Sequence, residues 1–314
     1  MAQTKAKKEK LKHDESLLRH VKKNWKLYTF LILPILYYVI FKYIPMLGNI
    51  IAFRRYKGGP NIFGERWVGF RYFEQFLTDS NFWQAFWNTL RLSIGYLLVR
   101  FPATLIFALL INEIRTKWWK KIVQTISYLP HFISLVVVCG MVKELLSSTG
   151  PINTLLASLG LDKIAFMSEP AWFDTVYIGS GIWQALGWGT ILYLTAMTNI
   201  DPGLYEAAEM DGANRFQQTI HVTIPGILPT IMTLLIMDIG NIITASNMQK
   251  ILLLYNPLTQ SRADIIDTLV YRMGISGGNF SYASAVGLFS AVIGLVLVTS
   301  ANYLSKKLTE TSLW

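Results

Sequence analysis

Six long apolar segments constrain the fold of this 314-residue chain more than any other feature. A helix that crosses the roughly 30 Å apolar core of a bilayer needs about 20 mostly apolar residues. Segments of this kind run from Leu27 to Ile51, Phe86 to Ile111, Ile122 to Leu146, Val176 to Thr198, Ile227 to Asn247 and Ala283 to Leu304. Polar residues and a proline interrupt the second segment, at Arg91, Arg100 and Pro102. The pattern predicts an all-α integral membrane protein with six transmembrane helices.

The composition agrees with this interpretation, because 52% of the residues are hydrophobic and only 15% are charged. The net charge of +10 raises the alternative of a nucleic-acid partner. Nine of the 29 Lys and Arg residues, however, lie in residues 1–26, and the rest of the chain carries a net charge of only +4. The basic excess is therefore a feature of the tail, and we expect no nucleic-acid partner. The single cysteine, Cys139, excludes a disulfide framework.

The distribution of basic residues predicts the orientation of the chain in the membrane. Six spans place both termini on one side, and that side holds sixteen Lys and Arg residues against nine on the other, with four inside the spans. Cytoplasmic loops of membrane proteins carry such an excess, so the pattern predicts an N-in, C-in topology. The expected organisation is a basic cytoplasmic tail at 1–26, a first transmembrane helix and outer loop at 27–82, a core at 83–305 and a cytoplasmic C-terminus at 306–314.

The loop between the fourth and fifth segments, at 201–226, is too polar to cross a membrane. Asp201 and Pro202 form a typical helix start, and the residues at 206–209 favour a helix. Gly212 permits a left-handed turn, and Pro225 can open the next helix. We expect a short helix parallel to the membrane, whose alanines allow close contact with a soluble partner.

This loop resembles the EAA loop of ABC-importer permeases, which has the pattern E-A-A, three residues, G, nine residues and I-x-L-P. The matching residues are Glu206-Ala207-Ala208, Gly212 and Val222-Thr223-Ile224-Pro225. Residues 111–134, 267–275 and 279–289 are similar to the LplB-type, MalF-like branch of the sugar permeases. The resemblance implies the transmembrane subunit of a type I importer, with the MetI-like permease fold and a cytoplasmic coupling helix. The residues it implies for contact with the ATPase are Glu206, Ala207, Ala208, Asp211, Gly212 and Pro225.

The resemblance also implies a function and partners. It implies a non-catalytic permease in the bacterial plasma membrane, which forms the path for an oligosaccharide or polysaccharide fragment together with a second permease. Two ABC ATPase subunits would bind ATP and Mg, and an extracellular solute-binding lipoprotein would deliver the sugar, in part to the outer segments 52–82 and 248–282. No glycine precedes a lysine in this chain, so it contains no phosphate-binding P-loop and no cofactor of its own is expected.

Sugar sites combine aromatic rings with hydrogen-bonding side chains. By this criterion the candidates for the substrate path are Asn88, Trp183, Gln184, Trp188, Asp238 and Asn241. A charge such as Asp238 near mid-membrane is costly and should meet a partner, for which Arg100 is the candidate. The alternative is that the glycines around the tryptophans serve helix packing and the tryptophans face lipid or a neighbouring helix.

Two other functional classes remain to be weighed. An ion-coupled secondary transporter or channel predicts charged residues that repeat in corresponding halves of the chain, and none are seen. A membrane enzyme requires a polar catalytic group of residues near one interface, and none stands out. Of the three classes, only the permease explains the motif at 206–225. The sequence leaves open the identity of the sugar and whether the second permease is identical or different.

Overall fold

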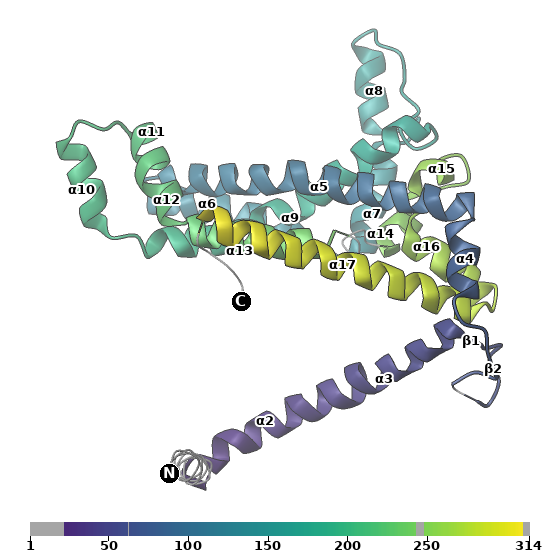
Figure 1. Cartoon of the computed structure of the whole chain (residues 1–314). Coiled ribbons are helices and arrows are strands. Elements are labelled where there is room, and N and C mark those ends of the chain that lie inside the picture. The colour runs from purple at the N-terminus through teal and green to yellow at the C-terminus, as the bar shows by residue number, and fades with distance from the viewer. Residues whose placement is uncertain (1–21, 62, 243–247, 310–314) are drawn as a thin grey trace, which may run out of the picture.

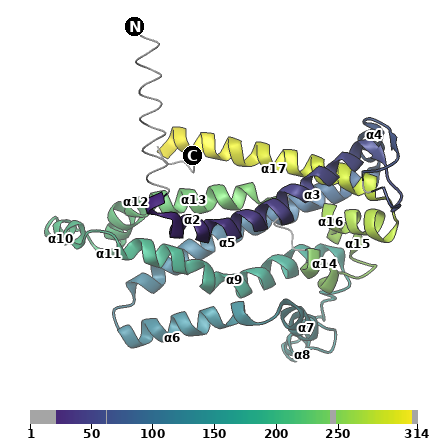
Figure 2. The same cartoon turned by 90° about the horizontal axis from the view of Figure 1, so that it is seen from below.

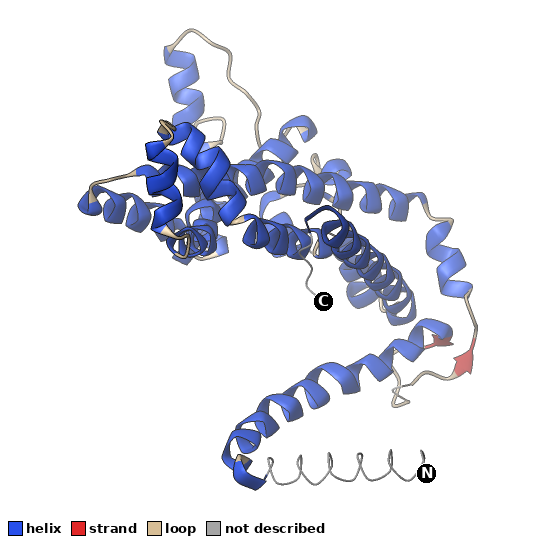
Figure 3. Ribbon diagram, turned by 60° about the vertical axis from the view of Figure 1, so that its left-hand side comes forward, coloured by secondary structure: helices blue, strands red, loops and turns tan. Residues whose placement is uncertain are grey.

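The computed structural model describes residues 22–61, 63–242 and 248–309, and shows a chain that is almost wholly helical (Figure 3). Four helices lie side by side along the body (Figures 1 and 2): α5 (Ser80–Glu113), α9 (Phe173–Thr198), α13 (Leu228–Gly240) and α17 (Phe280–Thr309). One end of the body carries α10 (Pro202–Met210). The other carries α4 (Arg71–Leu77) and the antiparallel pair β1 (Arg54–Arg55) and β2 (Arg66–Trp67). Most of the predicted tail, at 1–21, lies outside the described residues.

Three of the predicted spans are long apolar helices, at Trp25–Phe53, Ser80–Glu113 and Phe280–Lys307. The second continues without a break through Arg91, Arg100 and Pro102. It begins six residues earlier than expected because the side chain of Asp79 caps it, accepting a hydrogen bond from the Asn81 N–H at 2.9 Å. These three helices confirm the first, second and sixth segments as candidate spans.

The first span extends away from the body and joins it only near β1 (Figure 1). It consists of α2 (Trp25–Tyr38), the π-helical turn η1 (Val39–Tyr43), α3 (Ile44–Met46) and the 3₁₀ segment η2 (Leu47–Phe53), which packs against α17. Pro45 has no N–H to donate, and the π turn before it is closed by a bond from the Ile44 N–H to the Val39 carbonyl.

The third segment does not form the straight helix that was predicted from Ile122 to Leu146. It divides into α6 (Lys117–Tyr128) with η3 (Leu129–Phe132), and α7 (Leu135–Leu145), and the two parts are bent by 98°. Ile133 adopts an extended backbone at the break. Ser134 then caps α7 by accepting from the Val137 N–H at 3.4 Å, which starts a new helix.

The fifth segment forms α13, and a helix at Arg215–Gly226, in the preceding loop, meets α13 at a bend of 63°. This preceding helix contains α11 (Arg215–Gln218), the π turn η5 (Thr219–Thr223) and α12 (Ile224–Gly226). Pro225 therefore lies inside the preceding helix, and Pro229 in the first turn of α13 opens the membrane helix instead. α13 ends at Gly240, and the predicted end at Asn247 lies outside the described residues.

The fourth segment forms α9, whose 26 residues are long enough to cross a membrane. Among the described residues, three helices are long and apolar enough to cross a membrane, or up to five if each bent pair is one span. The helix α9 is not one of them. Its glycines, tryptophans and Gln184 explain this, because α9 packs against α5, α6 and α13 inside the protein. The count of six spans stays a prediction.

Glycines of α9 allow this close packing, as the alternative interpretation of the tryptophan-rich segment proposed. A Cβ at Gly187 would overlap the Ser127 carbonyl of α6, and one at Gly189 would lie 2.8 Å from Thr104 Cγ2 of α5. A Cβ at Gly179, in contrast, would meet nothing within 4 Å.

Short elements lie at the end of the body near α4. They are η4 (Pro170–Trp172), α14 (Met248–Leu254), α15 (Gln260–Ala263), α16 (Ile266–Val270) and η6 (Tyr271–Ser276). The helix α8 (Pro151–Ser158) projects from the body (Figure 1). A Gly-rich turn at 277–278 links η6 to α17, and Gly278 has a φ of +68°. A cluster of buried hydrophobic residues lies at each end of the body. The cluster that includes α4 contains Phe76, Phe82 and Tyr282. The cluster nearer α10 contains Tyr193 and Ile227.

Candidate functional site: a projecting loop and a charged cavity

The first arm of the 201–226 loop is the helix α10. The Asp201 carboxylate caps it by accepting from the Gly203 N–H at 3.0 Å. Gly212, with a φ of +79°, reverses the chain after Asp211, and the Ala213 N–H closes the end by donating to the Ala208 carbonyl at 2.9 Å. The predicted helix start and left-handed turn are both confirmed.

The second arm is tied to the first arm and to the body. Asn214 and Gln217 cap α11 reciprocally, with bonds of 2.9 and 2.8 Å. The Tyr205 hydroxyl of α10 lies 2.9 Å from Thr223 Oγ1. Arg215 pairs with Glu113 at the end of α5, at 3.0 Å. The loop is therefore one connected unit that contacts both α5 and the helix leading into α13.

The tip of the loop presents an exposed surface at one end of the molecule (Figure 1). Glu206 and Ala207 are exposed. Three large apolar side chains are exposed as well, Leu204 by 53%, Met210 by 88% and Phe216 by 72%. An apolar patch beside a carboxylate on a projecting element is typical of a surface that binds another protein.

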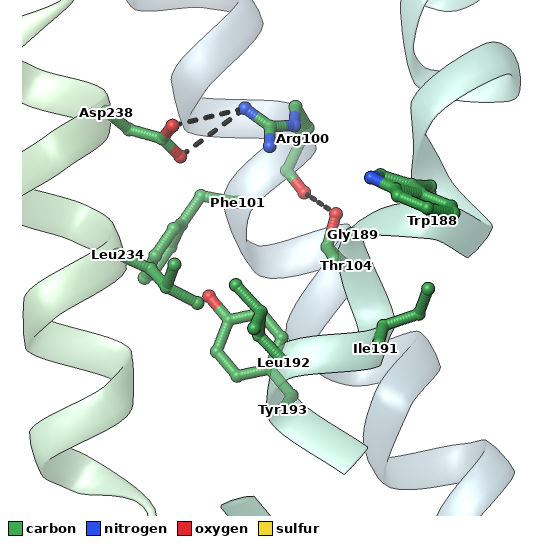
Figure 4. Close-up of a pocket in the computed structure, with 10 residues that line it drawn as sticks. All are labelled: Arg100, Phe101, Thr104, Trp188, Gly189, Ile191, Leu192, Tyr193, Leu234 and Asp238. Carbon is green, nitrogen blue, oxygen red and sulfur yellow. Dashed lines mark hydrogen bonds and ion pairs between the residues drawn. The ribbon is translucent and has the colours of Figure 1, made fainter. Parts of the chain in front are cut away.

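A cavity of about 450 Å³ lies between α5, α9 and α13. Arg100 and Asp238 pair directly in its wall, with Arg100 Nη1 at 3.3 Å from Asp238 Oδ1 and 3.4 Å from Oδ2 (Figure 4). Both side chains are nearly three-quarters buried. The pair predicted from depth and charge is thus present. The other lining residues are Phe101, Thr104, Trp188, Gly189, Ile191, Leu192, Tyr193 and Leu234.

The lining combines aromatic faces with polar groups. Trp188 stacks on His131 with ring centres 4.5 Å apart and planes inclined by 4°. Tyr193 and the Arg100–Asp238 pair add hydroxyl and charged groups to the same cavity. Such a surface can pack the C–H faces of a sugar and bond its hydroxyls.

The predicted path residues do not all meet in this cavity. Trp188 and Asp238 line it, whereas Gln184 lines a neighbouring cavity of about 310 Å³ and donates to the Ile133 carbonyl at 3.1 Å. Trp183 lines a largely apolar cavity between α7 and α9. Asn241 follows α13 as its C-cap residue.

Asn88 does not line the Arg100 cavity, and its side chain joins two parts of the fold instead. It is 4% exposed and donates from Nδ2 to the carbonyls of Ser261 and Asp264, at 2.9 Å each. These bonds tie α5 to the segment around α15. The roles of all six path candidates in transport stay predictions.

The structure also gives a partner to Arg91, the other arginine of α5. Arg91 Nε lies 3.0 Å from Asp174 Oδ2, and the guanidinium donates to the Arg262 carbonyl at 2.7 Å. Arg262 approaches the same Asp174 oxygen at 3.7 Å. This network joins α5, α9 and α15 at the end of the body opposite to α10.

Sequence reasoning missed Lys250, which it left in an outer segment. Lys250 is 5% exposed, and its Nζ donates to the Tyr177 carbonyl of α9 at 2.7 Å. The signal that could have found it is the run of apolar residues at 251–254 that follows directly. A lysine next to such a run in a membrane protein faces either water or protein.

Known proteins resemble this chain over most of its length. Residues 100–310 match the family described as binding-protein-dependent transport system inner membrane component. The protein LplB of Bacillus subtilis (strain 168) is 43% identical over 95% of this chain and 94% of its own length. The polygalacturonan/rhamnogalacturonan transport system permease protein YteP of the same strain is 41% identical over 98% of this chain and 95% of its own length.

A solved structure extends the similarity to the fold. A chain of the bacterial alginate ABC transporter in complex with an alginate pentasaccharide-bound periplasmic protein is 42% identical, with a TM-score of 0.86 over 94% of this chain and 99% of that chain. A second structure of a transporter involved in the import of the acidic polysaccharide alginate gives a TM-score of 0.85. The helical architecture described above is thus the MetI-like permease fold. The chain belongs to the family of binding-protein-dependent transport system inner membrane components, the multi-pass permeases of ABC importers.

Proposed function

We propose that this chain forms, with a second permease, the membrane path of an ATP-driven importer for an acidic oligosaccharide. An external binding protein delivers the sugar, and two ATPase subunits supply the energy. The observation that carries the proposal is the projecting 201–226 loop, whose Glu206-Ala207-Ala208 and Gly212 occupy an exposed, capped helix and its left-handed turn. The family match and the permease relatives support it.

The acidic class of substrate rests on the relatives. The solved relatives import the acidic polysaccharide alginate. In this chain the cavity between α5, α9 and α13 offers aromatic rings that suit a sugar. We therefore propose that the substrate of this chain is a sugar that carries carboxylates.

We infer an N-in, C-in topology with six spans. In this assignment α9 is one span, the bent pair of α6 with η3 and α7 is one span, and α13 belongs to the span that follows the 201–226 loop. The α10 end then faces the cytoplasm together with the basic residues Arg115, Lys117, Lys120 and Lys121 before and within α6. The hairpin β1–β2 and α4 lie on the outer side, where the binding protein docks.

The contacts of the loop provide a route from the ATPase to the path. When ATP closes the two ATPase subunits, they move α10. The Tyr205–Thr223 contact passes the motion to the helix that leads into α13, and the Arg215–Glu113 pair passes it to α5. These two helices carry Asp238 and Arg100, so movement of the loop repositions the two sides of the cavity.

Co-expression with candidate ATPase and permease subunits tests this proposal. We expect the wild-type chain to co-purify with both and to import an acidic pentasaccharide only with ATP. Glu206→Trp should insert normally but lose ATP-driven import. The matched control is Lys306→Trp, which changes an exposed charged residue near the end of α17. Import without an ATPase, or normal import by Glu206→Trp, would contradict the proposal.

A further inference from the structure

The neighbouring cavity of about 310 Å³ contains a buried cation that the functions described so far do not use. It lies between α5, η3, α9 and α14, and Lys250 lines it together with Tyr96, His131, Tyr177 and Gln184. Lys250 Nζ donates to the Tyr177 carbonyl at 2.7 Å and lies 4.7 Å from the centre of the Tyr177 ring. The ammonium is thus held at a defined place beside the cavity.

This cavity and the Arg100 cavity follow one another along the same two helices. α5 and α9 run in the same direction, because a Cβ at Gly95 would meet Ile178, and a Cβ at Gly189 would meet Thr104. Arg100 and Trp188 each lie four residues after a lining residue of the Lys250 cavity, and therefore on the same helix face. The Arg100 cavity is the one closer to the α10 end.

Two ring contacts separate the cavities. Tyr96 lines the Lys250 cavity, and its ring centre lies 5.7 Å from Arg100 Cζ. His131 lines the Lys250 cavity as well and stacks on Trp188, which lines the Arg100 cavity. The two spaces are therefore adjacent, with side chains rather than backbone between them.

The two cavities differ in charge. Arg100 faces Asp238, so the charges in its cavity cancel. The described residues that line the other cavity include Lys250 and His131 and neither Asp nor Glu. An ammonium and a carboxylate form a charge-assisted hydrogen bond that is about twice as strong as a neutral one. The second cavity therefore favours a ligand with a negative charge, and its tyrosine rings suit the apolar face of a sugar.

We propose that Lys250 is a specificity-determining residue, which receives a carboxylate of the passing oligosaccharide in this cavity before the sugar reaches the Arg100 cavity. This inference rests on the proposed function, the import of an acidic oligosaccharide. The two cavities, of about 310 and 450 Å³, fall in the range of about 300–1,000 Å³ that is usual for ligand sites.

Gly181 leaves room for the Lys250 ammonium and offers a second way to test its role. A Cβ at this position would lie 2.8 Å from both Lys250 Nζ and Tyr96 Cε2. Gly181→Ala should therefore displace the lysine head group and the tyrosine ring while it leaves every charge of the chain unchanged.

The experiment uses the complete importer in proteoliposomes, with its second permease, ATPases and binding protein. The probes are a uronic-acid pentasaccharide and the same pentasaccharide with its carboxyl groups reduced to alcohols. We expect Lys250→Met to lower uptake of the acidic sugar at least tenfold and to lower the ratio of acidic to reduced sugar. Lys250→Arg, which keeps the charge, should stay within about threefold of wild type, and Gly181→Ala should follow Lys250→Met. The matched control is Lys42→Met, at an exposed lysine of the first span.

The outcomes separate this inference from the proposed function. If the wild-type importer takes up the reduced sugar as well as the acidic one, the acidic substrate class is wrong. If wild type prefers the acidic sugar and Lys250→Met keeps that preference, the assignment of Lys250 is overturned. Equal loss of both sugars in Lys250→Met, without rescue by Lys250→Arg, would show a structural role and would also overturn it. If Lys250→Met does not assemble, an unchanged preference in Gly181→Ala overturns the assignment.

Discussion

Arg100 Nη1 of α5 lies 3.3 Å from Asp238 Oδ1 of α13, and this ion pair joins two helices in the wall of the Arg100 cavity. The pair is costly to place at membrane depth unless both charges are present. Because α13 follows directly from the 201–226 loop, the pair stands where the proposed motion of that loop would reach the path. It is therefore a position at which the two states of the transporter can differ.

A reciprocal charge swap tests the pair. Arg100→Asp and Asp238→Arg each leave two like charges in the cavity, so each should destabilise the protein by about 1–3 kcal/mol, between the values for exposed and buried pairs. The double variant restores an opposite pair and should recover much of the transport. Uptake and thermal unfolding in detergent measure both effects. A double variant that transports no better than either single variant would contradict the pairing.

This pair shows what the sequence could predict. Asp238 and Arg100 could be matched because an apolar segment sets the depth of each residue, and because an isolated charge at that depth is costly. The helix start at Asp201 and the left-handed turn at Gly212 were equally accessible, since each depends on a few neighbouring residues.

Features that depend on tertiary packing could not be predicted in this way. The 98° bend after Phe132 follows from a cap at Ser134 within a segment whose apolar residues suit a continuous helix. α9 is less apolar than a lipid-facing span because one side of it packs against α5, α6 and α13. Lys250 was missed because its environment is formed by Tyr177 and Gly181, which are far away in the sequence.

Substitutions of Gly212 test the turn of the loop. The residue has a φ of +79°, and a Cβ there would meet nothing within 4 Å, so only the backbone conformation requires glycine. Gly212→Val should cost about 1–2 kcal/mol or more, because left-handed backbone is unfavourable for a β-branched residue. Gly212→Asn tolerates this conformation and is the matched control. We expect Gly212→Val to lose at least tenfold in ATP-driven uptake and Gly212→Asn to stay near wild type. Equal activity of the two variants would show that the turn is not needed.

A pair of glycines in α9 tests the contact between α9 and α6. Gly187→Ala places a Cβ against the Ser127 carbonyl, and a rotamer change cannot relieve an overlap with backbone, so we expect destabilisation of about 1–3 kcal/mol. Gly179→Ala, in the same helix, meets nothing within 4 Å and should leave stability unchanged. Thermal unfolding of the purified variants measures the difference. Similar unfolding temperatures would mean that α6 and α9 pack less closely than described.

The Tyr205–Thr223 contact carries the last prediction, because it joins α10 to the helix that leads into α13. Tyr205→Phe removes one hydroxyl and keeps the ring. The Thr223 hydroxyl is buried, and a hydrogen bond of this kind contributes about 1 kcal/mol, or about fivefold in an equilibrium. We expect ATPase binding to persist while the number of sugars imported per ATP hydrolysed falls about fivefold, since α10 then moves without drawing α13 along. Tyr303→Phe, at an exposed tyrosine of α17, is the control and should keep the wild-type ratio. An unchanged ratio in Tyr205→Phe would mean that the motion reaches α13 through the covalent chain, or that the Arg215–Glu113 pair passes it to α5 instead. In the second case Arg215→Gln would produce the loss.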